Sequence, residues 1–126
     1  MDSNVRSHRD LIAWQRAFQL GMDIYRATEA FLKQEMYGLT SQLRRGVVSV
    51  SINIAEGYGR GRQADYLRFL RMARGALYEL DTELLFAVQL GMLDAEGHQY
   101  LQKSTDECGR VLAGLIRSIA NTKPSA

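Results

Sequence analysis

Apolar side chains recur at helical spacing in four separate stretches of the chain. These stretches cover residues 10–30, 39–57, 63–90 and 94–121. Within each stretch the apolar positions lie three or four residues apart, which places them on one side of an α-helix. Asp10 and Asp94 stand where an N-cap side chain is expected to start the first and the fourth helix. The links are short, which favours antiparallel neighbours, so the pattern predicts an all-α fold, an up-down-up-down antiparallel four-helix bundle.

The first stretch has a regular apolar face that we expect to lie in the core. Its members are Leu11, Trp14, Phe18, Met22 and Tyr25. The second and third stretches are apolar on two sides, which is typical of helices that are enclosed on two sides. Four helices of one chain leave part of that apolar surface uncovered, and a second copy is the simplest cover for it. The residues that we expect at such a homo-oligomer interface are Val48, Ile52, Leu67, Tyr78 and Leu85.

Composition fits one domain, which we place at residues 10–121 between flexible tails at 1–9 and 122–126. The chain has 126 residues, of which 46% are hydrophobic, and a single proline near its C-terminus. We find neither an apolar run of about 20 residues, as a membrane span needs, nor a signal peptide at the N-terminus. The single cysteine, Cys108, suits a reducing compartment. We therefore expect a soluble, cytoplasmic protein without a membrane partner.

Positive charge is concentrated in the middle of the sequence. Residues 37–75 contain seven arginines against two acidic residues, whereas residues 76–126 contain four basic and seven acidic side chains. Guanidinium groups suit bidentate contacts with phosphate, and tyrosines between them can stack on bases. This pattern favours a nucleic-acid surface, although a solvated or intersubunit salt-bridge face has the same pattern. The candidate nucleic-acid-binding residues are Arg44, Arg45, Arg60, Arg62, Arg68, Arg71 and Arg74.

Polar residues follow one flank of the second stretch. Gln42, Ser49, Asn53 and Glu56 recur there at helical spacing, and we expect them to form a hydrogen-bond network between helices or subunits. Glycines follow at every second position from Gly57, and we expect them to end the helix in a turn. They do not match a dinucleotide-binding loop, since they follow a helix instead of a strand.

No catalytic or metal-binding constellation is evident. Neither His8 nor His98 has a carboxylate three residues before it, as a di-iron bundle requires. The polar flank of the second stretch has no second acid, base or nucleophile of the kind that catalysis needs. We therefore predict no enzyme activity, no cofactor and no metal site.

The central block YGLTSQLRR, followed by VVSVSINIAEGYGR, resembles the signature of the four helix bundle protein family. The members of this family are also called intervening-sequence proteins of the large ribosomal RNA. The upstream DLIAWQRAFQL fits as well, and the resemblance covers roughly residues 10–93. Leu32 and Ser51 stand where relatives commonly have proline, so the second helix should be straighter than theirs.

The resemblance implies a barrel-like homopentamer of four-helix bundles. Members of the family are encoded within intervening sequences of large ribosomal RNA genes. Relatives also act as accessory variability determinants of diversity-generating retroelements, contacting a reverse transcriptase and its RNA. Together with the arginines, this favours a non-enzymatic oligomer that binds structured RNA, ribosomal or from a retroelement, in preference to DNA. The alternative is a protein-interaction scaffold, or an accessory subunit of a ribonucleoprotein or reverse-transcriptase complex.

Overall fold

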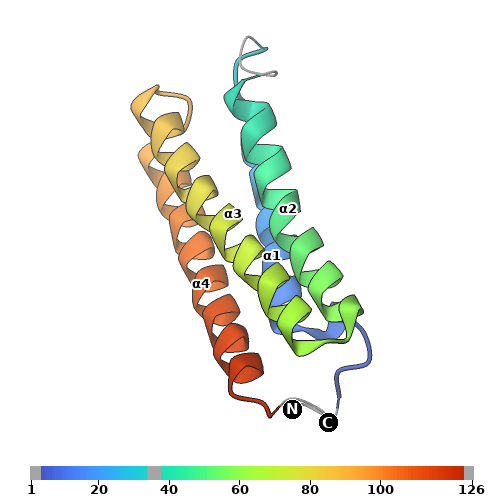
Figure 1. Ribbon diagram of the computed structural model, residues 1–126. Helices are drawn as coiled ribbons and strands as arrows, with labels where there is room; N and C mark the ends of the chain where they lie inside the picture. The colour runs from blue at the N-terminus through green and yellow to red at the C-terminus, as the bar shows by residue number, and fades with distance from the viewer. Residues whose placement is uncertain (1–3, 34–37, 124–126) are drawn as a thin grey trace.

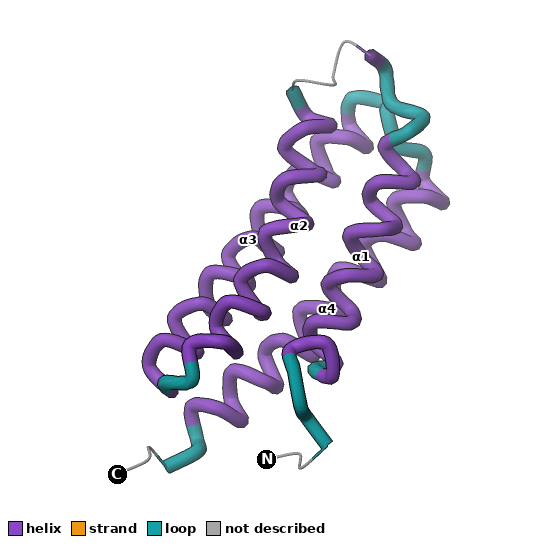
Figure 2. The backbone as a smooth tube through the Cα atoms, turned by 90° about the vertical axis from the view of Figure 1, so that its right-hand side faces the viewer, coloured by secondary structure: helices purple, strands orange, loops and turns teal. Residues whose placement is uncertain are grey.

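The computed structural model describes residues 4–33 and 38–123, and within these ranges the chain forms α-helices and no strand. The helices are α1 (Ile12–Thr28), α2 (Leu39–Arg60), α3 (Gln63–Gln89) and α4 (Ala95–Ala120), and a short 3₁₀ helix, η1 (His8–Asp10), precedes them. Figures 1 and 2 show the four helices side by side, and each contacts two others in the order α1, α2, α3, α4 around the bundle. This arrangement confirms the all-α prediction and the number of helices. The outermost residues of the predicted tails, 1–3 and 124–126, lie outside the described ranges.

All four helices contribute to one hydrophobic core. Its largest fully buried side chains are Leu20, Ile24, Leu43, Val47, Val50, Ile54, Leu70, Leu80, Leu84, Cys108 and Leu112. Burying one such aliphatic side chain contributes about 1.5–3 kcal/mol, so this cluster supplies the main drive for folding. Burial raises the pKa of the Cys108 thiol to about 12, which keeps the sulfur protonated and unreactive at neutral pH. None of the described helices is long and apolar enough to cross a membrane.

The face that α1 buries differs from the one expected. Ala13 and Ala17 are buried, together with Leu20 and Ile24, whereas Phe18 is 50% exposed. Met22 and Tyr25 are also exposed, and Trp14 is only half-buried. Apolar residues cover more than half of the circumference of this helix, so periodicity alone does not decide which arc faces the core. The two alanines allow a closer approach of the neighbouring helices than an arc of aromatic rings would allow.

The two helix caps predicted from the sequence are confirmed only in part. Asp94 caps α4 as predicted, because its Oδ1 accepts a hydrogen bond of 2.7 Å from the amide of Gly97. The prediction that Asp10 caps α1 is wrong. Its carboxylate accepts from the amides of Arg6 and Ser7 and completes the cap of η1, and these bonds lower its pKa. An aspartate close to two consecutive helix starts can cap either helix, and here Asp10 caps the earlier one, η1.

The α2 helix does not end at Gly57 as expected, but continues to Arg60. The residue after it, Gly61, has a φ of +75° and is the left-handed C-cap. Gly57 is buried against α3 instead. A Cβ atom at this position would lie 2.9 Å from the Cβ of Phe69 and 3.1 Å from the carbonyl oxygen of Tyr66. Gly57 is therefore a site of close approach between α2 and α3 and not a helix stop.

Side-chain hydrogen bonds set the register between α3 and α4. At the start of α3, Gln63 donates through Nε2 to the carbonyl oxygen of Ile119, over 2.6 Å, near the end of α4. Further along α3, Asp81 accepts from Nε2 of Gln102, also over 2.6 Å, in the first half of α4. The two helices therefore run in opposite directions, and the middle of α3 lies beside the middle of α4.

Candidate nucleic-acid interface

The first predicted arginine, Arg44, holds α2 against α1. Its Nε donates to Oγ1 of the buried Thr28 over 2.8 Å, and its Nη2 donates to the carbonyl oxygen of Tyr25 over 3.5 Å. The guanidinium carbon lies 4.8 Å from the centre of the Tyr25 ring. Carbonyl groups at a helix C-terminus lack partners within the helix, and Arg44 contributes donors there. This side chain is committed to the fold.

Arg60 and Arg68 meet at a single aromatic ring. Their guanidinium carbons lie 5.0 Å and 4.5 Å from the centre of the Phe69 ring. Each also forms an ion pair on its own helix, Arg60 with Glu56 at 3.2 Å and Arg68 with Asp65 at 3.6 Å. Such exposed pairs contribute at most about 1 kcal/mol, so a phosphate can replace the carboxylates at little cost.

Arg74 lies on the side of α3 that faces α4. Arg74 lines a hollow between the two helices together with Arg110 of α4. Arg71 lies one turn from Arg74 and is exposed, and Arg117 lies two turns beyond Arg110 on the same face of α4. We call Arg71, Arg74, Arg110 and Arg117 the arginine strip. Within residues 4–33 and 38–123, none of the four forms an ion pair.

Sequence reasoning missed Arg110 and Arg117, because it assigned them to an acidic segment. Residues 76–126 carry a net negative charge, but not all of their carboxylates lie near these two arginines. Glu107, for example, pairs with Arg16 of α1. The available signal was the spacing of seven residues between the two arginines, which places both on one face of a helix.

The remaining two predicted arginines do not join the strip. Arg45 is exposed on α2, and Arg62 is the exposed residue that immediately precedes α3. Neither forms an ion pair with any other described residue. The seven arginines of the central segment therefore divide into one structural residue, one pair at Phe69, two members of the strip and two separate exposed cations.

The polar flank of α2 does not form a network between helices in the described part of the chain. Asn53 donates through Nδ2 to the carbonyl oxygen of Ser49 over 2.9 Å and to its Oγ over 3.0 Å, both within α2. Glu56 pairs with Arg60, and Gln42 is exposed. A role for these residues between subunits stays a prediction.

The α2–α3 contact also holds a carboxylate, that of Glu83, whose burial sequence reasoning did not predict. Oε1 of Glu83 is buried and has no hydrogen-bond partner among the described residues, and it lies 3.6 Å from the position of a Cβ on Gly46. Burial raises the pKa of Glu83, and the charge of Glu79 raises it further. A carboxyl group whose pKa is higher in the folded state loses stabilisation as the pH rises through that pKa.

We therefore expect Glu83→Gln to stabilise the protein at neutral pH. The rise in melting temperature should be modest, on the order of 2 °C, because the side chain is partly exposed. This rise should vanish as the pH falls below 4.5, the ordinary pKa of a glutamate, because Glu83 is then protonated in both the folded and the unfolded state. Glu96→Gln, at an exposed position on α4, is the control. A lower melting temperature for Glu83→Gln would show that the carboxylate has a counter-charge, as a second copy could supply.

The predicted interface residues are mostly accessible in one chain. Tyr78 is 71% exposed and Ile52 58% exposed, Val48 and Leu85 are also exposed, and Leu67 packs partly against the core. Sequence reasoning missed further exposed apolar side chains on α3. These are Met72, Phe86 and the C-cap residue Leu90.

Comparison with known proteins places this arrangement in a family. The profile of the 23S rRNA-intervening sequence protein family matches residues 9–114. The chain belongs to this family. The match confirms the resemblance read from the central block and extends it into α4. No curated protein is detectably similar to the chain in sequence.

A solved structure shares the fold of this family member. It is the crystal structure of a protein with unknown function from the S23 ribosomal protein family of Bacteroides thetaiotaomicron VPI-5482. The TM-score is 0.77, and the alignment covers 84% of this chain and 96% of that protein. Sequence identity is 17%, so the likeness concerns the fold alone.

Proposed function

We propose that this member of the 23S rRNA-intervening sequence protein family is a non-enzymatic, cytoplasmic, self-associating bundle that binds structured RNA, ribosomal or from a retroelement. The observation that carries the proposal is the arginine strip. It comprises four arginines of two helices, of which Arg74 and Arg110 line one hollow, and none of the four forms an ion pair with a carboxylate of the described residues. An unpaired row of arginines on one face is the electrostatic footprint of phosphate recognition.

Further arginines extend this surface. Arg60 and Arg68 lie over the Phe69 ring, and their exposed ion pairs with Glu56 and Asp65 contribute little stability. Arg62 is exposed at the start of α3. Contacts of this kind read the phosphate backbone and shape of RNA and not its sequence. We therefore expect sequence-tolerant binding, in which Arg44 acts only through the fold.

Self-association is part of the proposal, with the homopentamer implied by the sequence resemblance as the expected form. The unit is an up-down-up-down bundle, which the opposite directions of α3 and α4 support. Exposed apolar side chains on two helices support the assembly, Val48 and Ile52 on α2 and Leu85 on α3. Light scattering of a dilute solution measures the mass, and a value near the 14.2 kDa of one chain would contradict the proposal.

The second candidate is a scaffold for a partner protein, such as a reverse transcriptase. The exposed apolar residues on α1 favour it, since Phe18, Met22 and Tyr25 form a face that one chain leaves uncovered. A protein that is captured by the bundle after ribonuclease treatment, with no RNA affinity of the bundle itself, would support this alternative.

The salt dependence of RNA binding tests the first proposal. A labelled structured RNA, followed by fluorescence anisotropy, should bind at low salt and dissociate as the salt concentration rises. Each neutralised phosphate should contribute about 0.7–0.9 to the slope of log affinity against log salt concentration. If no binding is detected even at low salt, the RNA proposal is wrong and the scaffold replaces it.

A further inference from the structure

We propose that the hollow between α3 and α4 binds a single nucleotide of an unpaired RNA segment. Arg74 and Arg110 hold its phosphate, Tyr78 stacks on its base, and Asp81 and Asp106 accept hydrogen bonds from the amino group of the base. The inference rests on the RNA-binding function proposed above and assigns it a site. It adds a preference for bases that carry an amino group.

The size and the floor of the hollow suit a planar ring. Its volume is about 510 Å³, within the usual range for small-ligand sites. Three small side chains of α4 line it, Thr105, Gly109 and Ala113. A Cβ atom on Gly109 would meet no other atom within 4 Å, so the space above this glycine is open. Tyr78 is 71% exposed beside the hollow, which leaves the faces of its ring accessible for stacking.

The hollow has its two arginines toward one end and Asp81 toward the other, with Asp106 one turn from Arg110 on α4. Because α3 and α4 run in opposite directions, Arg74 lies near the level of Arg110, while Asp81 and Asp106 lie further toward the start of α4. From Arg74 to Asp81 there are seven residues, a rise of about 10 Å along α3. This is roughly the reach from the phosphate of a nucleotide to the far edge of its base. A cationic end and an anionic end at that separation match the two ends of a nucleotide.

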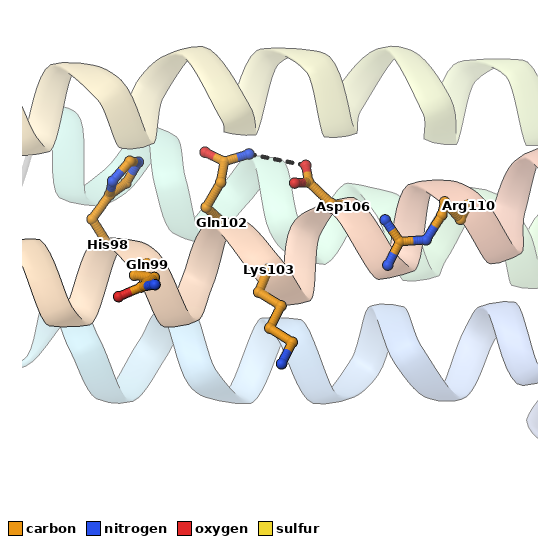
Figure 3. A pocket seen from close by; sticks show the side chains of 6 residues that line it. All are labelled: His98, Gln99, Gln102, Lys103, Asp106 and Arg110. Atoms are coloured by element: carbon orange, nitrogen blue, oxygen red, sulfur yellow. Dashed lines mark hydrogen bonds between the residues drawn. The ribbon is translucent and has the colours of Figure 1, made fainter.

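Gln102 engages both aspartates. Its Nε2 donates to Oδ1 of Asp81 over 2.6 Å and to Oδ1 of Asp106 over 3.0 Å. Figure 3 shows Gln102 and Asp106 projecting from α4 toward α3 and joined by this bond, while Lys103 points to the opposite side. Asp106 stands four residues before Arg110, a spacing that favours an ion pair along a helix. The amide of Gln102 occupies Oδ1 of Asp106, and no ion pair joins Asp106 to Arg110 among the described residues, so the guanidinium of Arg110 is available to an external anion.

The two aspartates give the site a way to discriminate between bases. Each carboxylate keeps lone pairs that Gln102 does not use, and these can accept from an exocyclic amino group. Cytosine presents such a donor at N4, whereas uracil presents an oxygen at O4 that a carboxylate repels. Both bases have similar size and stacking surface, so cytidine and uridine differ mainly at the edge that the aspartates would contact.

The experiment compares labelled oligocytidine and oligouridine of about ten nucleotides, measured by anisotropy at neutral pH and low salt. Wild-type protein should bind the cytidine oligomer roughly five-fold to ten-fold more tightly. Asp81→Asn with Asp106→Asn should remove the difference, because an amide both donates and accepts. Gly109→Leu should weaken both oligomers by about ten-fold by filling the hollow without changing charge. Gly75→Leu is its matched control, since Gly75 lies outside the hollow and also faces open space.

Equal wild-type affinity for the two oligomers, or equal affinity of Gly109→Leu and Gly75→Leu, would overturn the nucleotide site. If RNA binding still depends on salt and on the arginine strip in that case, the proposed function stands without this site. If wild-type protein binds neither the oligomers nor a structured RNA, the proposed function itself has failed. An acidic peptide that binds and loses affinity on Gly109→Leu, with no RNA affinity, would overturn the nucleotide in favour of a protein ligand.

Discussion

Replacing Arg71 and Arg74 together by glutamate will abolish RNA binding while the helical content is retained. The two side chains supply the α3 half of the arginine strip and have no ion pair within the described residues, so both are available to phosphates. A hydrogen bond to a charged group contributes about 1.5–3 kcal/mol, and the two reversals add repulsion, so affinity should fall by about 100-fold or more. Anisotropy with a structured RNA measures the loss, and the salt slope should become shallower.

The control for this variant carries the same change of charge elsewhere. Arg9 and Lys33 are exposed and belong to neither α3 nor α4, so Arg9→Glu with Lys33→Glu should leave most of the affinity. Oligomer mass must be followed in parallel by light scattering. Loss of assembly before loss of affinity would make Arg71 and Arg74 interface residues and would move the RNA surface to Arg60 and Arg62.

Gly57→Leu will destabilise the fold, although leucine is the better helix former. A Cβ at position 57 already falls 2.9 Å from the Cβ of Phe69, and these are atoms that can move only if α2 and α3 separate. Overpacking of this kind costs typically 1–3 kcal/mol, and a side chain as large as leucine belongs at the upper end. The gain in helix propensity, about 1 kcal/mol, does not offset it. Urea unfolding followed by circular dichroism should show a loss of about 2 kcal/mol.

Gly59 provides the matched control on the same helix. It is exposed, and a Cβ there would meet no atom within 4 Å, so Gly59→Leu keeps only the gain in helix propensity. We expect this variant to be slightly more stable than the wild type, by up to about 1 kcal/mol. If Gly57→Leu proved as stable as Gly59→Leu, the close approach between α2 and α3 at this position would not exist.

Helix positions were accessible from the sequence because their signals are local. The four apolar periodicities predicted the four helices, and Asp94 marked the start of α4 through a bond to an amide three residues away. The central sequence block identified the family, which the profile match confirms. Errors at helix ends arose where one residue had two possible roles. Asp10 lies within reach of two helix starts, and Gly57 can end a helix or admit a neighbour.

The tertiary structure alone decided which residues meet. It selected the alanine arc of α1 over the aromatic arc, because the distance between packed helices, and not the spacing along one helix, decides which arc fits. It also brought Arg110 of an acidic segment to the hollow that Arg74 lines, and it committed Arg44 to α1. A sum of charges along the sequence averages over all faces of a helix, whereas a ligand meets only one face. For this protein, therefore, the sequence determined the helices and the family, and the packing of α3 against α4 determined the candidate surface.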